Sequence, residues 1–180
     1  MDAKIYDGNT EVTGHHGLEI GLEGLVNGDE GLVYGGVSGG FAFDTPDVGE
    51  NKTITATGIF LMSPGSQTKY KNYKLLNETA TGNVGVITQQ MLHVYAQSFT
   101  YSGGTTFEAE LEGVQINYWE MDGEREIVTA TLTTSGKNVG DYTYTDEETA
   151  GEWEYTVTLD SGNYYVSGGG MLTIRQREVA

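Results

Sequence analysis

The protein has 180 residues, with 26 acidic and 9 basic side chains and a formal net charge of −17. This charge argues against nucleic acids and anionic membrane surfaces as partners, because both bind proteins through Lys and Arg. The sequence has no Cys, which excludes disulfides and thiolate metal sites. It also lacks the apolar run of roughly 18 residues that a membrane helix requires.

Three short motifs, here called the landmarks, occur twice and in the same order. They are Tyr6-Asp7-Gly8 with Tyr101-Ser102-Gly103, Val48-Gly49 with Val139-Gly140, and Asn72-Tyr73 with Asn163-Tyr164. A repeat of this length is typical of a duplicated small domain. It predicts a first domain at residues 1–90 and a second at residues 91–180.

The composition predicts short strands joined by glycine-containing turns, because Gly is abundant and helical stretches are missing. Residues 18–22 alternate apolar with polar or small side chains, which is typical of a strand with one wet face. The clearest strand of the first half is expected at 52–62. Its alternation places Ile54, Ala56 and Phe60 on one face.

Residues 91–96 are apolar on both sides of an extended stretch and predict a short, stiff connector between the domains. In the second half, Ala109 and Leu111 alternate with glutamates, which again indicates a half-buried strand. The strongest alternation lies at 153–159. It favours a place for Trp153 and Tyr155 among the apolar residues of the core, with an aromatic platform for sugars, formed by Trp153 and the Tyr142/Tyr144 alternation, as the alternative.

No segment of useful length has the 3.6-residue period of a helix, so the fold class is all-β. We expect two tandem small antiparallel β domains, built as Ig-like sandwiches, with β-grasp-like modules as the alternative. The final segment, 172–180, corresponds to the end of the first half, where the chain runs on into the next domain. The chain is therefore expected to be a piece of a longer array.

Motifs along both halves resemble known repeats of large bacterial surface proteins. In the first half, Lys4 opens Lys-x-Tyr-Asp-Gly-x-Thr, Leu22 opens Leu-x-Gly-Leu-Val-x-Gly-Asp, Asp47 opens Asp-Val-Gly-x-x-Lys-Thr-Ile-Thr, and Asn72 opens Asn-Tyr-x-Leu. This series resembles the YDG repeat. The second half is similar to the MBG (mostly bacterial glycine-rich) repeat, through Phe99-Thr100-Tyr101-Ser102-Gly103, Asn138-Val139-Gly140, Tyr155-Thr156-Val157-Thr158, Ser161-Gly162-Asn163-Tyr164 and Leu172-Thr173-Ile174. The resemblance implies tandem β-rich modules of long secreted or surface-anchored, adhesin-like proteins, with no catalytic residues to carry over.

The landmarks indicate turn and corner chemistry. Gly8 suits a turn that needs positive φ, and Asp7 can cap that turn through its side chain. Asn72-Tyr73 is analogous to a tyrosine corner, in which the ring is buried and the hydroxyl bonds to the backbone.

No motif of a nucleophile elbow, a zinc protease or a phosphate-binding loop is present, so we predict no enzyme and no catalytic residues. His15-His16 are neighbours that would face opposite ways in a strand, which favours exposed loop residues over metal ligands. Calcium is the one cofactor to consider, because acidic residues gather in predicted turns, although without the spacing of an EF-hand loop. The candidate calcium ligands are Asp29, Glu30, Asp44 and Asp47.

We expect a non-catalytic spacer segment of a large bacterial cell-surface or secreted adhesin-like protein, located outside the cell. The alternative is an adhesion module that itself binds a glycan or a host matrix protein. For such a ligand, Tyr118 and Trp119 are the candidate contacts, because neighbours in a strand face opposite ways and one ring is then exposed. The expected partners are neighbouring repeats of the same polypeptide, and the segment itself is expected to be a monomer.

Overall fold

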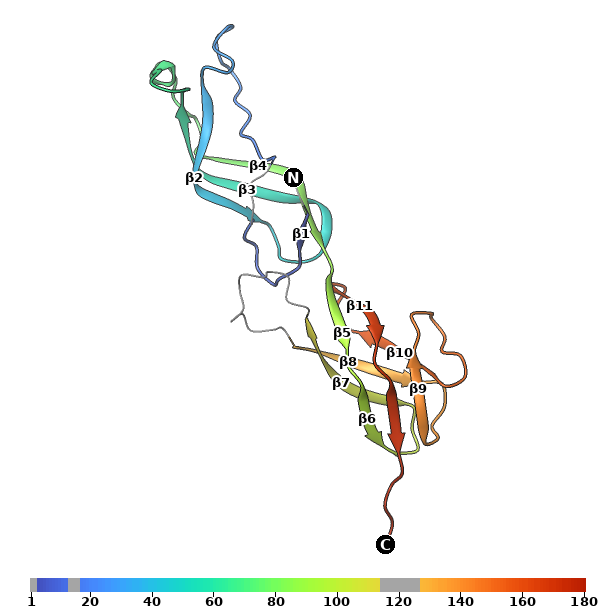
Figure 1. Ribbon diagram of the computed structural model, residues 1–180. Coiled ribbons are helices and arrows are strands. Elements are labelled where there is room, and N and C mark those ends of the chain that lie inside the picture. The colour runs from blue at the N-terminus through green and yellow to red at the C-terminus, as the bar shows by residue number, and fades with distance from the viewer. Residues whose placement is uncertain (1–2, 13–16, 114–126) are drawn as a thin grey trace. The chain divides into compact units, whose positions relative to one another are not determined.

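The computed structural model describes residues 3–12, 17–113 and 127–180, which form strands and one short 3-10 helix, η1 (Lys69–Asn72). The chain divides into two compact units, residues 1–88 (unit 1) and 89–180 (unit 2), seen in Figure 1. The all-β architecture of two small domains that the sequence predicts is confirmed. No helix in the described ranges has the length and apolar character needed to cross a membrane.

Unit 1 is built on a four-stranded sheet. Its strands are β1 (Lys4–Ile5), β2 (Tyr34–Phe43), β3 (Gly49–Met62) and β4 (Thr79–Thr88). The spatial order is β1-β4-β3-β2, and β2, β3 and β4 are joined by antiparallel pairing. The two-residue β1 instead runs parallel to the end of β4 (Figure 1). A small core forms where Phe43, Ile54 and Ile87 of these strands meet Val12.

An irregularity at Gly58 of β3 changes which side chains of that strand are buried. Two residues of β2, between Val37 and Gly40, lie opposite Gly58 alone, and Gly58 has a φ of +64°. The alternation of β3 changes phase at this left-handed glycine, so Ile59 is buried and Phe60 is 44% exposed. The prediction that Phe60 lies on the buried face is therefore wrong, because a strict period of two assumes that every residue of the strand is extended, and Gly58 is not.

The segment at 18–22 is extended but is not a strand of the sheet. Its apolar residues are nevertheless half-buried and the residues between them are exposed, as the alternation predicts. Ile20 lies directly over Gly35 of β2, where an added Cβ would come within 2.7 Å of Ile20 Cγ2. The segment thus packs against β2 through the Ile20 side chain. The predicted burial pattern is present, and the predicted strand is not.

Unit 2 contains eight strands in the described residues, in the order β11-β5-β7-β8-β10-β9-β12-β6. They are β5 (Gln90–Val94), β6 (Gln97–Thr100), β7 (Thr106–Gly113), β8 (Ile127–Thr134), β9 (Gly140–Tyr144), β10 (Glu154–Leu159), β11 (Tyr164–Gly169) and β12 (Leu172–Arg175).

The sheet of unit 2 closes on itself. β5 leads directly into β6, and β11 leads directly into β12, so each pair is one nearly continuous strand (Figure 1). These two long strands lie side by side, because β11 pairs with β5 and β12 pairs with β6, both in parallel. A sheet that curls round on itself in this way encloses its core. The enclosed residues include Leu92, Leu111, Leu132, Tyr142, Tyr155 and Leu172, each 1% exposed or less.

Gly170 lies between β11 and β12, where the pairing of β11 with β5 ends and the pairing of β12 with β6 begins. Having no side chain, it lets the two long strands approach closely there. A Cβ on Gly170 would lie 2.3 Å from the backbone nitrogen of Ala96, so no larger residue fits without backbone movement. The Gly170 N–H donates to the Val94 carbonyl at 2.7 Å. The buried Tyr155 hydroxyl donates to the Gly170 carbonyl, and burial, with the nearby Tyr144, raises the pKa of Tyr155 to about 12.

Two expectations about connections change. Residues 91–96 were expected to form a connector, but 90–94 are β5 of unit 2, in which Leu92 and Val94 are fully buried. Each unit also mixes parallel with antiparallel pairs, whereas purely antiparallel domains were expected. The period-two alternation is the same in both kinds of pairing, so the sequence pattern does not distinguish them.

The Tyr-x-Gly landmarks occupy equivalent places in the two units. The Tyr6 N–H donates to the Thr88 carbonyl at 2.8 Å, where β1 passes the end of β4. The Tyr101 N–H donates to the Arg175 carbonyl at 2.9 Å, where β6 passes the end of β12. In both units the landmark therefore follows the strand that lies parallel to the last one.

The turn after each tyrosine has the predicted chemistry. Gly8 and Gly103 have φ of +79° and +80°. Asp7 Oδ1 and Ser102 Oγ each accept the N–H two residues further on, at 3.0 and 3.3 Å. Both the positive φ and the side-chain cap are confirmed.

The Val-Gly landmarks also correspond, whereas the Asn-Tyr landmarks do not. Gly49 lies opposite Ile87, and Gly140 lies opposite Ile174, the same position relative to the end of the last strand. Tyr73 follows η1, but Tyr164 begins β11. The structural repeat is thus a ladder of three strands: β1-β4-β3 in unit 1 and β6-β12-β9 in unit 2.

We predict that Gly103→Ala lowers the free energy of unfolding of unit 2 by about 1–2 kcal/mol, because Ala disfavours the left-handed conformation. The cost is one of backbone conformation, since the added Cβ meets no atom closer than 3.9 Å. Urea unfolding of the whole chain, followed by tryptophan fluorescence, measures it, because both tryptophans lie in residues 89–180. Gly104→Ala is the matched control, and an equal loss in that variant would contradict the argument.

Candidate functional site

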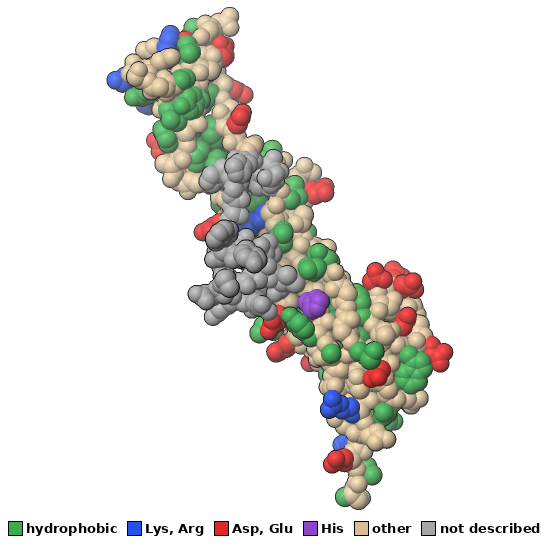
Figure 2. Space-filling view, viewed as in Figure 1, with side chains coloured by type: hydrophobic (Ala, Val, Ile, Leu, Met, Phe, Trp, Pro, Cys, Tyr) green, Lys and Arg blue, Asp and Glu red, His purple; other side chains and the backbone are tan. Residues whose placement is uncertain are grey.

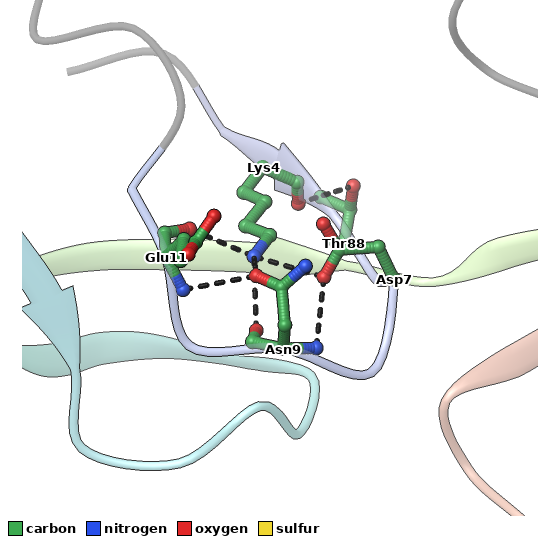
Figure 3. A network of polar contacts seen from close by, with 5 residues as sticks. All are labelled: Lys4, Asp7, Asn9, Glu11 and Thr88. Carbon is green, nitrogen blue, oxygen red and sulfur yellow. Dashed lines mark hydrogen bonds and ion pairs between the residues drawn. The ribbon is translucent and has the colours of Figure 1, made fainter. Parts of the chain in front are cut away.

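Polar groups gather around the side chain of Lys4 in unit 1 (Figure 3), and we call Lys4, Asp7, Asn9 and Glu11 the Lys4 cluster. The Lys4 ammonium donates to the backbone and side-chain oxygens of Asn9 at 2.9 and 2.6 Å and to the backbone oxygen of Glu11 at 2.8 Å. It lies 2.9 Å from Asp7 Oδ1. One cation therefore fixes the loop that follows β1.

The strand geometry explains why a lysine is inside. Lys4 is 7% exposed and its neighbour Ile5 is 38% exposed, because successive side chains of β1 face opposite ways. The Thr88 hydroxyl donates to the Lys4 carbonyl at 3.3 Å, and the Phe43 ring lies 5.9 Å from the ammonium. An ammonium whose hydrogens all go to oxygen acceptors has no lone pair to act as a nucleophile. The Lys4 cluster is thus suited to structural support rather than to catalysis.

A second cluster in unit 1, the Asp29 cluster, consists of Asp29, Lys69 and Tyr73. The Tyr73 hydroxyl donates to Asp29 Oδ2 at 2.6 Å and accepts the Val26 N–H at 3.1 Å. Lys69 Nζ lies 2.9 Å from Asp29 Oδ1. The predicted bond from the landmark hydroxyl to the backbone is therefore present for Tyr73, whose ring is half-buried.

The Asp29 cluster changes the pKa of its members. The Tyr73 hydrogen bond first, and the Lys69 ammonium second, hold the pKa of Asp29 below its ordinary value although burial opposes them. The same contact with Asp29 raises the pKa of Lys69 and of Tyr73. The carboxylate form of Asp29 is thus the form that the fold stabilises.

The structure does not bring the calcium candidates together. Both oxygens of Asp29 are engaged, Glu30 accepts a backbone N–H at 2.7 Å, and Asp44 lies 3.4 Å from Lys52. Within the described ranges, no group of three or more His, Asp or Glu side chains is placed to hold a metal ion. Asp47, the fourth candidate, is therefore not part of such a group either. His15, His16, Tyr118 and Trp119 lie outside the described residues.

Trp153 is not in the core, contrary to the prediction. It precedes β10, has a φ of +56° and is 44% exposed. The buried alternation begins only at Tyr155, which is fully enclosed. Trp153 instead borders an open pocket of unit 2 together with Tyr142. The sequence favoured the core over an aromatic platform at Trp153, because alternation cannot locate the first residue of a strand.

Both clusters of unit 1 lie within the residues that the comparison with protein families identifies. Residues 1–82 match the YDG domain family. The resemblance of the first half to the YDG repeat is therefore confirmed. The YDG-matched region contains the whole Lys4 cluster and the whole Asp29 cluster, including the landmark Tyr73. Comparison with curated proteins and with solved structures found no match.

We predict that Lys4→Met lowers the free energy of unfolding of unit 1 by about 2–3 kcal/mol, because it leaves the oxygens around Nζ without a charged donor. Lys74→Met, an exposed lysine of the same unit, is the control and should change stability by less than about 0.5 kcal/mol. Urea unfolding followed by circular dichroism measures both variants. Equal stability of the two would rule out a structural role for the ammonium.

A second prediction concerns acid. Because the pKa of Asp29 is lower in the folded chain than in the unfolded chain, its contribution is complete above the unfolded pKa, near 3.9, and disappears as pH falls through the folded pKa. The stability difference between the native chain and Asp29→Asn should therefore shrink as pH is lowered from 6 to 3. Urea midpoints across that range test this, with Glu23→Gln as an exposed carboxyl control. A pH-independent difference would be the contrary outcome.

Proposed function

We propose that the chain is a non-catalytic structural segment of a longer bacterial cell-surface or secreted adhesin-like protein, in which tandem β domains supply length. The observation that carries the proposal is the parallel pairing of the opening and last strands in each unit. The YDG match of residues 1–82 supports the family context. The second half is proposed to be an MBG-like repeat, and neighbouring repeats are the proposed partners.

Parallel terminal strands suit a segment that carries tension. In unit 2 the chain begins its first long strand with Gln90 opposite Tyr164 and ends its last with Arg175 opposite Thr100. Tension on the two chain ends pulls these strands along each other, which loads the hydrogen bonds between them together instead of one at a time. The ladder then resists extension as a whole.

The chemistry of the described residues agrees with a structural role. The Lys4 ammonium is saturated with oxygen partners, and the Asp29 carboxylate is engaged by a hydroxyl and an ammonium. Both clusters hold loops against strands. In both clusters the buried charged group is engaged by partners of the same unit.

We predict that Gln97→Pro lowers the force at which unit 2 unfolds. The Gln97 N–H donates to the Met171 carbonyl at 3.0 Å across the β6–β12 ladder, and proline removes that donor. Loss of about 1 kcal/mol from the ladder should speed unfolding roughly fivefold. Single-molecule stretching of the whole chain from its two ends measures the force and the rate.

Ser98→Pro is the matched control, because neighbouring N–H groups of a strand point to opposite sides and the Ser98 N–H faces away from β12. Gln97→Ala, which keeps the N–H, controls for the lost side chain. Unfolding at the same force in the native chain and in Gln97→Pro would contradict the proposal that the β6–β12 hydrogen bonds resist tension. Unfolding at forces too low to detect would contradict the spacer role itself.

A further inference from the structure

Trp153 combines a disfavoured backbone with an exposed aromatic ring. Its φ of +56° lies in the left-handed region that bulky L-residues avoid, and the side chain is 44% exposed. Strained backbone of this kind is concentrated at binding and catalytic sites. An exposed ring contributes less to the core than a buried one, so packing alone does not account for the strain.

The indole ring has a fixed seat. A Cβ on Gly140 would lie 2.5 Å from Trp153 Cζ3, so the ring rests directly on the Gly140 backbone. The ring of Tyr142 lies 5.1 Å away, between centroids, at 45°. These contacts hold the indole in one orientation and leave part of it open to solvent.

The backbone on either side of Trp153 is also fixed. The Trp153 carbonyl accepts the Thr143 N–H at 2.9 Å, and the Gly151 carbonyl accepts the Glu154 N–H at 3.2 Å. The Glu154 carboxylate closes the turn by accepting the Gly151 N–H at 2.7 Å. Ser135 Oγ accepts the Glu154 N–H at 3.3 Å. The ring is therefore held ready for contact before any ligand arrives.

The pocket beside Trp153 has about 380 Å³ and a lining that mixes aromatic with polar groups. Its polar side chains include Ser135, Asn138 and Glu152. The Asn138 carbonyl accepts the Tyr142 hydroxyl at 2.7 Å, which fixes the backbone there. Within the described residues, the Asn138 amide and the Glu152 carboxylate have no hydrogen-bond or ion-pair partner, so both are open to a ligand.

We propose that this pocket binds a neutral sugar ring, stacked on the exposed part of the Trp153 indole. A pyranose offers an apolar face of C–H groups to an aromatic ring and equatorial hydroxyls to amide, hydroxyl and carboxylate groups around it. The pocket volume lies at the small end of ligand sites, which suits one or two sugar rings. This site is independent of the proposed spacer role and adds a contact to it.

The negative charge of the chain and the single exposed aromatic ring at the pocket favour a neutral sugar over other ligands. Figure 2 shows Asp and Glu side chains on the visible face of unit 2, and the chain carries a net charge of −17. Phosphate, sulfate and uronic acid groups would be repelled by this field and by Glu152. A quaternary ammonium needs a cage of several exposed rings, whereas Tyr142 is only 1% exposed and Trp153 is a single platform.

The test follows the indole N–H signal of Trp153 by NMR in the whole chain, in a Trp119→Phe background that leaves one tryptophan. The probes are methyl glycosides of glucose, galactose and mannose, N-acetylglucosamine, and the disaccharides cellobiose and lactose. The expected result is a saturable shift with at least one probe. We expect Asn138→Ala and Glu152→Gln each to weaken it at least threefold, with the melting temperature checked for each variant. Trp153→Ala removes the indole reporter, so its binding is followed through the backbone amide signals of the chain, recorded for the native chain as well, and should be at least tenfold weaker.

Tyr165→Ala is the matched control, because Tyr165 is also 44% exposed in unit 2 but lies outside the pocket. This variant should bind like the native chain. Three outcomes overturn the proposal: no saturable shift with any probe, binding that survives both Asn138→Ala and Glu152→Gln, or a response to tetramethylammonium that exceeds the response to every sugar. Since Asn138 and Glu152 side chains are exposed, their variants keep the test decisive if Trp153→Ala does not fold.

Discussion

The pairing of an opening strand in parallel with the last strand of the same unit is the constraint on which the rest of the structure depends. Parallel neighbours cannot be joined by a tight turn, so everything between Ile5 and Thr79, or between Thr100 and Tyr164, serves as the connection. The pair therefore joins the two ends of the unit, and the rest of the unit lies between them in the sequence. In unit 2 it closes the sheet and encloses the core; in unit 1 it binds the first strand to the last.

The two units stabilise this pairing with different chemistry. Lys4 lies opposite Ile87, and at the equivalent place Phe99 lies opposite Ile174. The Lys4 ammonium is held by the loop oxygens, whereas the Phe99 ring stacks on Phe107 at 4.6 Å between centroids. This difference explains the landmark residues that follow. Where the strand carries a cation, the turn has a carboxylate, Asp7; where it carries an aromatic ring, the turn has a neutral cap, Ser102.

Residues that repeat build the ladder, and residues that do not repeat give each unit its own surface. Gly49 and Gly140 hold equivalent positions, but a Cβ on Gly49 would make only ordinary contact with Lys52 at 3.6 Å, whereas Gly140 supports the Trp153 indole. The aromatic platform is thus specific to unit 2, and the Asp29 cluster is specific to unit 1. Tension-bearing and sugar contact, as proposed here, are compatible because they use different residues of unit 2.

The sequence by itself determined the all-β class, the repeated landmarks, the positive φ of Gly8 and the YDG resemblance, because these depend on local conformation and on residue order. Tertiary structure alone decided which side chains are buried wherever the alternation of apolar and polar residues does not predict it. The left-handed conformation of Gly58, which the pairing with β2 sets, turned Phe60 outward. Lys4 became a buried anchor and Trp153 an exposed platform because distant segments, the last strand for one and Gly140 for the other, define their surroundings. Parallel pairing likewise joins residues more than 70 positions apart, and a local sequence pattern cannot predict a partner at that distance.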